Sequence, residues 1–130
     1  MVLKYTDDEA AAIEVSYSGH DVVAQRSHTL QRLSIQPGEE ILDVGAGPGF
    51  LAREMADATG STGRVVGVDM SEAMVRRATE RNDCAWVSYI QGDATELPVD
   101  DAGFDIVVST QVAEYMADLT PYAAEIARVL

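Results

Sequence analysis

The sequence contains a single cysteine, Cys84, and a single lysine, Lys4, among its 130 residues. One cysteine excludes an intramolecular disulfide framework and a metal site built from several thiolates, so we expect no metal centre. No apolar run approaches the roughly 18 residues of a transmembrane helix, and residues 1–9 lack the apolar core of a signal peptide. We therefore expect no membrane span and a cytoplasmic location.

Positive charge is also scarce, because nine Lys and Arg residues face 22 Asp and Glu residues, which gives a net charge of −13. Such a surface repels the phosphates of nucleic acids and of anionic membranes, so we expect neither as a partner. An excess of carboxylates with almost no lysine indicates adaptation to high salt, where screening suppresses self-repulsion. An ordinary acidic cytoplasmic protein is the alternative.

Residues 1–35 have a polar, helical pattern. Thr6 and Glu9 have the spacing of a capping box before the first apolar helical positions, and Ser18-Gly19 interrupts that helix. A second helix is predicted over residues 21–33. Pro37-Gly38 then ends the pattern, so we predict a helical lid over residues 1–35 and a separate α/β domain over residues 36–130.

From residue 40 onward, short apolar runs alternate with helical patterns. Near-continuous apolar strands separated by helices predict an α/β fold, a Rossmann-like parallel sheet with helices on both faces. Right-handed crossovers place the first strand inside the sheet, with a switch point between it and the fourth strand. Ser71 and Thr120 are the expected caps of two helices, and Arg76, Arg77 and Arg81 are expected to point outward. The predicted strands are 41–44, 65–68, 86–90 and 104–109.

Polar residues follow the predicted strands at the edge where such sheets bind ligands. Asp43 precedes a glycine loop at residues 45–49, and Asp69 ends the second strand, where a carboxylate can accept both ribose hydroxyls. A dinucleotide is disfavoured because Phe50 stands where the third glycine of the usual pattern would be, and Asp43 repels phosphate. The Walker-type loop is excluded, since no Gly-Lys-Ser/Thr follows. S-adenosylmethionine, which carries an ammonium, a sulfonium and no phosphate, suits this site better; a nucleotide-dependent oxidoreductase stays the alternative.

Four segments in order, ILDVGAGPGFLA (41–52), VVGVDMSEAM (65–74), QGDATELP (91–98) and FDIVVS (104–109), resemble successive motifs of the class I S-adenosylmethionine-dependent methyltransferases. The resemblance covers residues 36–130 and is nearest to the small-molecule enzymes related to quinone biosynthesis. It implies methyl transfer from S-adenosylmethionine to a small molecule, with S-adenosylhomocysteine as the product. A non-catalytic cofactor-binding module or partner subunit is the alternative.

The resemblance also implies roles for individual residues. The glycine loop would lie beneath the methionine part with Asp43 facing its ammonium, Asp69 would hold the ribose, and Asp43, Asp69 and Asp93 would gather around one adenosine. Structural roles are the alternative for Tyr17 and Met70 in the core, for Asp93 as a turn cap and for Ser109 as a filler. The residues expected to bind the cofactor are Tyr17, Asp43, Gly45, Ala46, Gly47, Gly49, Asp69, Met70, Asp93, Ala94, Ser109 and Gln111.

Methyl transfer from a sulfonium is mainly a matter of positioning, so a general base is optional. The candidates for such a base are His20, Glu114 and Tyr115, whereas His28 is expected on the surface. In this family three further strands usually follow the helix that ends near Leu130. We therefore expect the N-terminal half of the fold only, with strand 104–109 as an exposed apolar edge that favours a homodimer.

Overall fold

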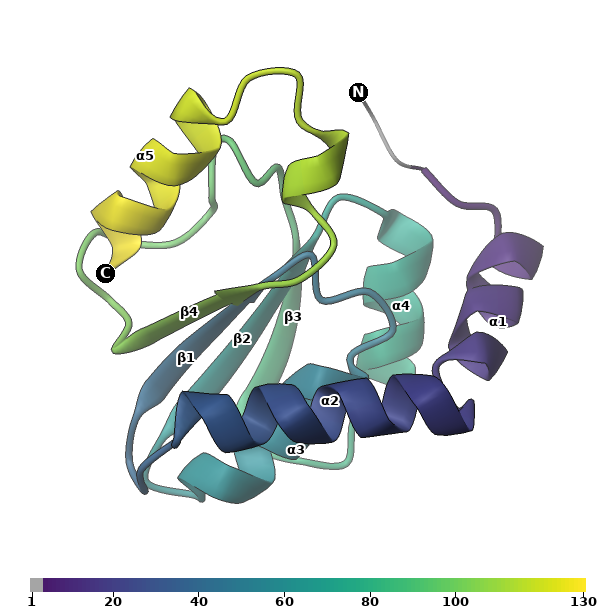
Figure 1. Cartoon of the computed structure of the whole chain (residues 1–130), viewed down its shortest axis with the longest axis horizontal. Coiled ribbons are helices and arrows are strands. Elements are labelled where there is room, and N and C mark those ends of the chain that lie inside the picture. The colour runs from purple at the N-terminus through teal and green to yellow at the C-terminus, as the bar shows by residue number, and fades with distance from the viewer. Residues whose placement is uncertain (1–3) are drawn as a thin grey trace.

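Four parallel strands form the centre of the computed structural model, which describes residues 4–130 (Figure 1). Their order is β3-β2-β1-β4, so β1 pairs with both β2 and β4, and Ile41 lies opposite Val65 and Ile106. The predicted parallel sheet and its switch point between β1 and β4 are confirmed. The strand bounds are β1 (Glu40–Val44), β2 (Arg64–Asp69), β3 (Val87–Gln91) and β4 (Ile106–Ser109).

Helices cover both faces of this sheet because its side chains alternate between two apolar clusters. Ile41 and Val65 pack with α3 on one face, whereas Leu42 and Val66 pack with residues of α5 on the other. Figure 1 shows α2 and α3 below the sheet and α5 above it. The helices are α1 (Asp7–Ser16), α2 (His20–Leu33), α3 (Phe50–Thr59), α4 (Glu72–Arg81) and α5 (Thr120–Val129), with a short 3₁₀ turn, η1 (Ala113–Tyr115).

Two of the three expected helix caps are confirmed. Thr6 forms the predicted capping box with Glu9, and the Ser71 hydroxyl accepts a hydrogen bond from the Met74 N–H at 3.3 Å. The expectation for Thr120 is wrong, because Leu119 is the N-cap of α5 and has no side-chain cap bond. Thr120 is instead the first residue of α5, and its N–H donates to the Asp118 carboxylate at 2.9 Å.

Helix α1 lies against α4 rather than against the sheet. Ala10 and Ile13 pack on Ala73 and Met74, and ion pairs flank this apolar contact. The α4 arginines lie outside its buried face, as expected, and they also pair with acidic residues of the facing helix, which the sequence analysis did not predict. The pairs are Asp7–Arg76, Glu14–Arg77 and Glu14–Arg81.

Among residues 4–130, strand β4 pairs only with β1 and so forms one edge of the sheet, as expected. Its side chains are half-buried or buried, since Ile106 and Val107 pack against opposite clusters. Cys84 is buried in the same cluster that Trp86 packs against. No helix within residues 4–130 combines the length and apolar character needed to cross a membrane. Residues 1–3, which belong to the predicted lid and to the segment inspected for a signal peptide, lie outside the described residues.

Candidate functional site

The loop between β1 and α3 has a backbone that only glycine adopts readily. Gly45, Gly47 and Gly49 have φ angles of 78°, 56° and 87°, all in the left-handed region. The N–H groups of Gly45 and Ala46 donate to the Val68 carbonyl at 2.7 and 3.0 Å, which ties the loop to the end of β2. The sequence therefore builds a rigid turn whose main chain can approach a ligand closely.

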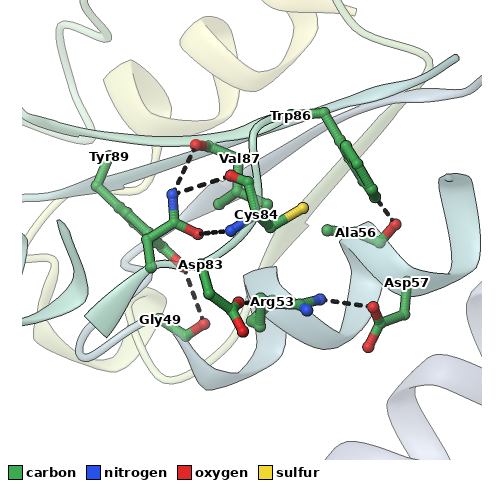
Figure 2. A network of polar contacts seen from close by, with 10 residues as sticks. Gly49, Arg53, Ala56, Asp57, Asp83, Cys84, Trp86, Val87 and Tyr89 are labelled. Atoms are coloured by element: carbon green, nitrogen blue, oxygen red, sulfur yellow. Dashed lines mark hydrogen bonds and ion pairs between the residues drawn. The ribbon is translucent and has the colours of Figure 1, made fainter. Parts of the chain in front are cut away.

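Two aromatic side chains, one in β3 and one just before it, contact the glycine loop and α3. The Tyr89 hydroxyl donates to the Gly49 carbonyl at 3.1 Å, and the Trp86 indole donates to the Ala56 carbonyl in α3 at 2.9 Å (Figure 2). A Cβ atom at Gly67 would lie 2.6 Å from the Tyr89 ring, so the absent side chain makes room for this tyrosine. Tyr89 thus positions the glycine loop and the start of α3, and Trp86 holds the second half of α3, roles that the sequence analysis did not identify.

Asp69 lies at the end of β2 and is held by two backbone groups. Its carboxylate accepts the Gly47 N–H at 2.8 Å and the Ser71 N–H at 2.9 Å. Burial raises the pKa of this carboxyl above its ordinary value, although both hydrogen bonds act in the opposite direction. Asp69 is therefore fixed in orientation, with acceptor capacity left for a ligand.

A cavity of about 140 Å³, here called cavity 1, opens beside Asp69. Its wall is mostly apolar and includes Tyr5 and Tyr17 from the N-terminal segment, Tyr115 from η1 and residues of the glycine loop. Seven predicted cofactor-binding residues line it, together with the candidate base Tyr115. The seven are Tyr17, Gly45, Gly47, Asp69, Met70, Ala94 and Gln111.

Asp43 faces a second cavity of about 280 Å³, here called cavity 2. Cavity 2 shares Tyr17, Gly45 and Gln111 with cavity 1, so the two spaces adjoin, and Ala46 also lines it. Asp43 is 2% exposed. Burial raises the pKa of Asp43 to about 7, and the charge of Asp69 adds to this effect.

The structure does not bring all three expected carboxylates into one cavity, which corrects the sequence expectation. Asp69 lines cavity 1, Asp43 lines cavity 2, and Asp93 is exposed and lines neither. The reason is local, because one Asp93 oxygen accepts both the N–H and the hydroxyl of Thr95, at 2.8 and 2.7 Å. These bonds hold the pKa of Asp93 below its ordinary value, as expected for the turn cap considered above.

Two further predicted binding residues lie outside both cavities. The Ser109 hydroxyl donates to the Val44 carbonyl at 3.2 Å, which is the role of a filler between β1 and β4. Gly49 serves instead as the N-cap of α3, and a Cβ atom there would lie 2.5 Å from the Tyr89 hydroxyl.

The candidate bases differ in position. His20 is exposed at the first residue of α2, and Glu114 is exposed in η1, and neither lines a cavity. Tyr115 lines cavity 1 although 39% of it is exposed. His28 is exposed, as expected.

A cluster of arginines around Phe50 was missed by the sequence analysis. The Phe50 ring stacks on Tyr17 with centroids 6.1 Å apart, and the guanidinium carbons of Arg81 and Arg26 lie 3.9 and 5.1 Å from its centroid. Arg81 also donates to the Pro48 carbonyl. The cluster therefore joins the N-terminal helices to the glycine loop. No pattern within a single helix predicts it, because it forms where separate helices meet.

The donor set of the two cavities favours a cationic ligand with hydroxyl groups over a phosphate. Two carboxylates, Asp43 and Asp69, face the cavities. Arg26 lines cavity 2, but its Nε donates to both Glu54 oxygens at 3.2 Å and its Nη1 to the Tyr17 carbonyl at 2.7 Å. Its charge is therefore already matched, and an anion would meet net repulsion.

The chain is similar to known proteins both in sequence and in fold. A family model described as a methyltransferase domain matches residues 42–130. A demethylmenaquinone methyltransferase of Oceanobacillus iheyensis is 32% identical over 96 residues, which are 72% of this chain and 40% of that protein. The chain thus spans less than half the length of this curated relative.

Solved structures show the same fold over the whole chain. A methyltransferase of Haloferax volcanii, solved in complex with the Trm112 methyltransferase activator, matches with a TM-score of 0.84 and 30% identity, covering 100% of this chain and 57% of that one. An N-methyltransferase of Haemonchus contortus, solved with phosphomonomethylethanolamine and S-adenosylhomocysteine, matches with a TM-score of 0.84 and 30% identity, covering 97% and 31%.

Proposed function

The chain belongs to the class I S-adenosylmethionine-dependent methyltransferases, and from this premise we propose that it binds S-adenosylmethionine and transfers its methyl group to a small-molecule acceptor. The observation that carries the proposal is the position of Asp69. Its carboxylate is anchored by Gly47 and Ser71 at the mouth of an apolar cavity, where it can accept two vicinal hydroxyls.

The lining residues support specific roles toward this cofactor. Asp69 accepts the ribose hydroxyls, and Met70 with Ala94 contacts the adenine in cavity 1. Gly45, Gly47 and Gln111 line the methionine part, while Asp43 faces the ammonium from cavity 2. Tyr17 lies between the two cavities and covers the bound molecule. Three of the expected binding residues act indirectly. Asp93 closes a turn with Thr95, Ser109 bonds β4 to β1, and Gly49 begins α3.

S-adenosylmethionine supplies an already activated methyl group, so this chain's contribution is orientation. Fixing two reactants in line can provide on the order of 7–11 kcal/mol of the barrier. The left-handed glycine loop and the doubly anchored Asp69 are rigid elements of the kind that such positioning needs. Tyr115 is the candidate base that lines cavity 1, for acceptors that must lose a proton.

Further features support the setting of this activity. The buried free thiol of Cys84 suits the reducing cytoplasm. The net charge of −13 suits a protein adapted to high salt. The unpaired edge of β4 offers a surface for a homodimer, and a monomer in analytical ultracentrifugation would contradict that part of the proposal.

Titration calorimetry followed by a transfer assay tests the function. We expect saturable binding of S-adenosylhomocysteine and no binding of NAD. Label from [methyl-³H]S-adenosylmethionine should then appear in one member of a panel of quinols, phenols, amines and thiols. Binding without methyl transfer would support the alternative of a non-catalytic cofactor-binding module, whereas binding of NAD alone would overturn the proposal.

A further inference from the structure

The Asp43 side chain is almost completely buried, at 2% exposed, and it lines cavity 2. Among residues 4–130 it takes part in no hydrogen bond or ion pair, yet no fully enclosed side-chain oxygen of these residues lacks a partner, so the Asp43 oxygens keep some access to cavity 2. Its position in β1 points it into cavity 2, on the same face of the sheet as Ile41. A buried carboxylate without a partner favours its neutral form.

The titratable groups around Asp43 do not compensate its charge. Asp69 at the end of β2 is itself an acid and repels it. Tyr17, before α2, and Tyr89 of β3 carry neutral hydroxyls whose pKa values are raised by burial, that of Tyr89 to about 12. Arg26 of α2 is matched by Glu54 of α3. In the free protein the pKa of Asp43 therefore lies near 7.

Resting on the proposed function, we infer that the cofactor's primary ammonium displaces a proton from Asp43 when it binds. The exchange is balanced: the carboxyl O–H bond breaks, its proton passes to solvent, and the carboxylate then pairs with an ammonium that keeps all its protons. Cofactor affinity in this protein is thus coupled to pH through a residue that does not take part in methyl transfer.

The sign of the coupling follows from the two protonation states. The ligand binds the charged carboxylate, so protonation of the free protein competes with binding and affinity falls as pH falls. With a free-state pKa of about 7, and a carboxylate that stays charged in the complex throughout this range, affinity weakens by about tenfold between pH 8 and pH 6. Asp69 contributes less, because two backbone N–H bonds favour its charged form.

Calorimetry with S-adenosylhomocysteine, which carries the same ammonium, tests the inference on the whole chain. Titrations at pH 6, 7 and 8 in buffers of different ionisation enthalpy report both affinity and protons released. We expect release to approach about one proton per ligand at pH 6 and to fall toward zero at pH 8. Asp43→Asn should remove most of the release and most of the pH dependence. The exposed histidines are the matched control, since the double variant His20→Gln/His28→Gln should keep both.

Each outcome decides a different point. Binding of S-adenosylhomocysteine with equal affinity at pH 6 and 8 and no proton release would overturn the inference and leave the proposed function intact. Persistence of the release in Asp43→Asn would also overturn it. Absence of binding at every pH would overturn the proposed function and the inference together. If Asp43→Asn does not fold, a ¹³C carboxyl titration of the wild-type protein, with and without ligand, must show the Asp43 pKa fall on binding.

Discussion

Asp69 is the residue on which recognition of the nucleoside depends. Both of its oxygens already accept backbone N–H groups, so its carboxylate is oriented before any ligand arrives. We expect Asp69→Ala to weaken S-adenosylhomocysteine binding at least tenfold, because charge-assisted bonds to ribose are worth roughly 1.5–3 kcal/mol. Titration calorimetry measures the change.

A matched control separates this loss from a general effect of charge. Asp100 is an exposed carboxylate for which the structure gives no hydrogen bond among the described residues and which lines neither cavity. Asp100→Ala should therefore bind as the wild type does. Unchanged affinity in Asp69→Ala would mean that the ribose lies elsewhere.

At the scale of elements, Glu14 fastens α1 to the rest of the site. Its carboxylate accepts hydrogen bonds from the Arg77 Nε and the Arg81 Nη1, both at 2.5 Å. The Arg81 guanidinium in turn lies over the Phe50 ring. Partial burial raises the pKa of Glu14, but the two arginines outweigh it and hold the pKa below its ordinary value. The contact is therefore present at neutral pH and is lost as pH falls through that lowered pKa.

Removing this charge should loosen α1 without unfolding the sheet. We expect Glu14→Gln to speed hydrogen exchange of the amides of Asp7–Ser16 by about fivefold, which corresponds to about 1 kcal/mol for two partly buried ion pairs. Glu80→Gln, an exposed change on α4, is the control and should leave exchange in α1 unaltered. Equal exchange in the two variants would show that apolar contacts alone hold α1.

The two central strands were predictable because each is a short apolar run that begins soon after a glycine, Gly38 for the first and Gly63 for the second. Ile41–Val44 and Val65–Val68 had to be strands buried on both faces, and the parallel order followed from the crossovers. The start of α5 was not predictable from Thr120 alone, because Asp118 accepts the Thr120 N–H and Thr120 becomes the first residue of the helix rather than its cap.

The site was predictable only in part, for a different reason. Asp43 and Asp69 follow from their positions at strand ends, whereas the orientation of Asp93 depends on a turn closed by Thr95. The arginine cluster depends on how α1 docks on α4, and no pattern within one helix encodes that contact. The role of Tyr89 was not predicted, because tyrosine is common in strands and its sequence position does not reveal the hydrogen bond to Gly49.

For the whole molecule, net charge is the dominant property. A chain with 22 acidic and nine basic residues repels itself at low ionic strength, and added salt screens this repulsion over about 3 Å at 1 M. We expect the Tm to rise between 50 mM and 1 M KCl. Thermal unfolding followed by circular dichroism checks this, and a Tm that stays constant or falls would contradict adaptation to high salt.

The central claim is that one nucleoside cofactor occupies the glycine loop and the end of β2. An ¹⁵N-resolved NMR titration with S-adenosylhomocysteine tests it most directly, because each amide reports its own surroundings. The account predicts saturable shifts that are largest at Gly45, Gly47, Asp69 and Ala94, with little change in α5. Saturable shifts confined to residues outside both cavities, or no shifts at all, would contradict it.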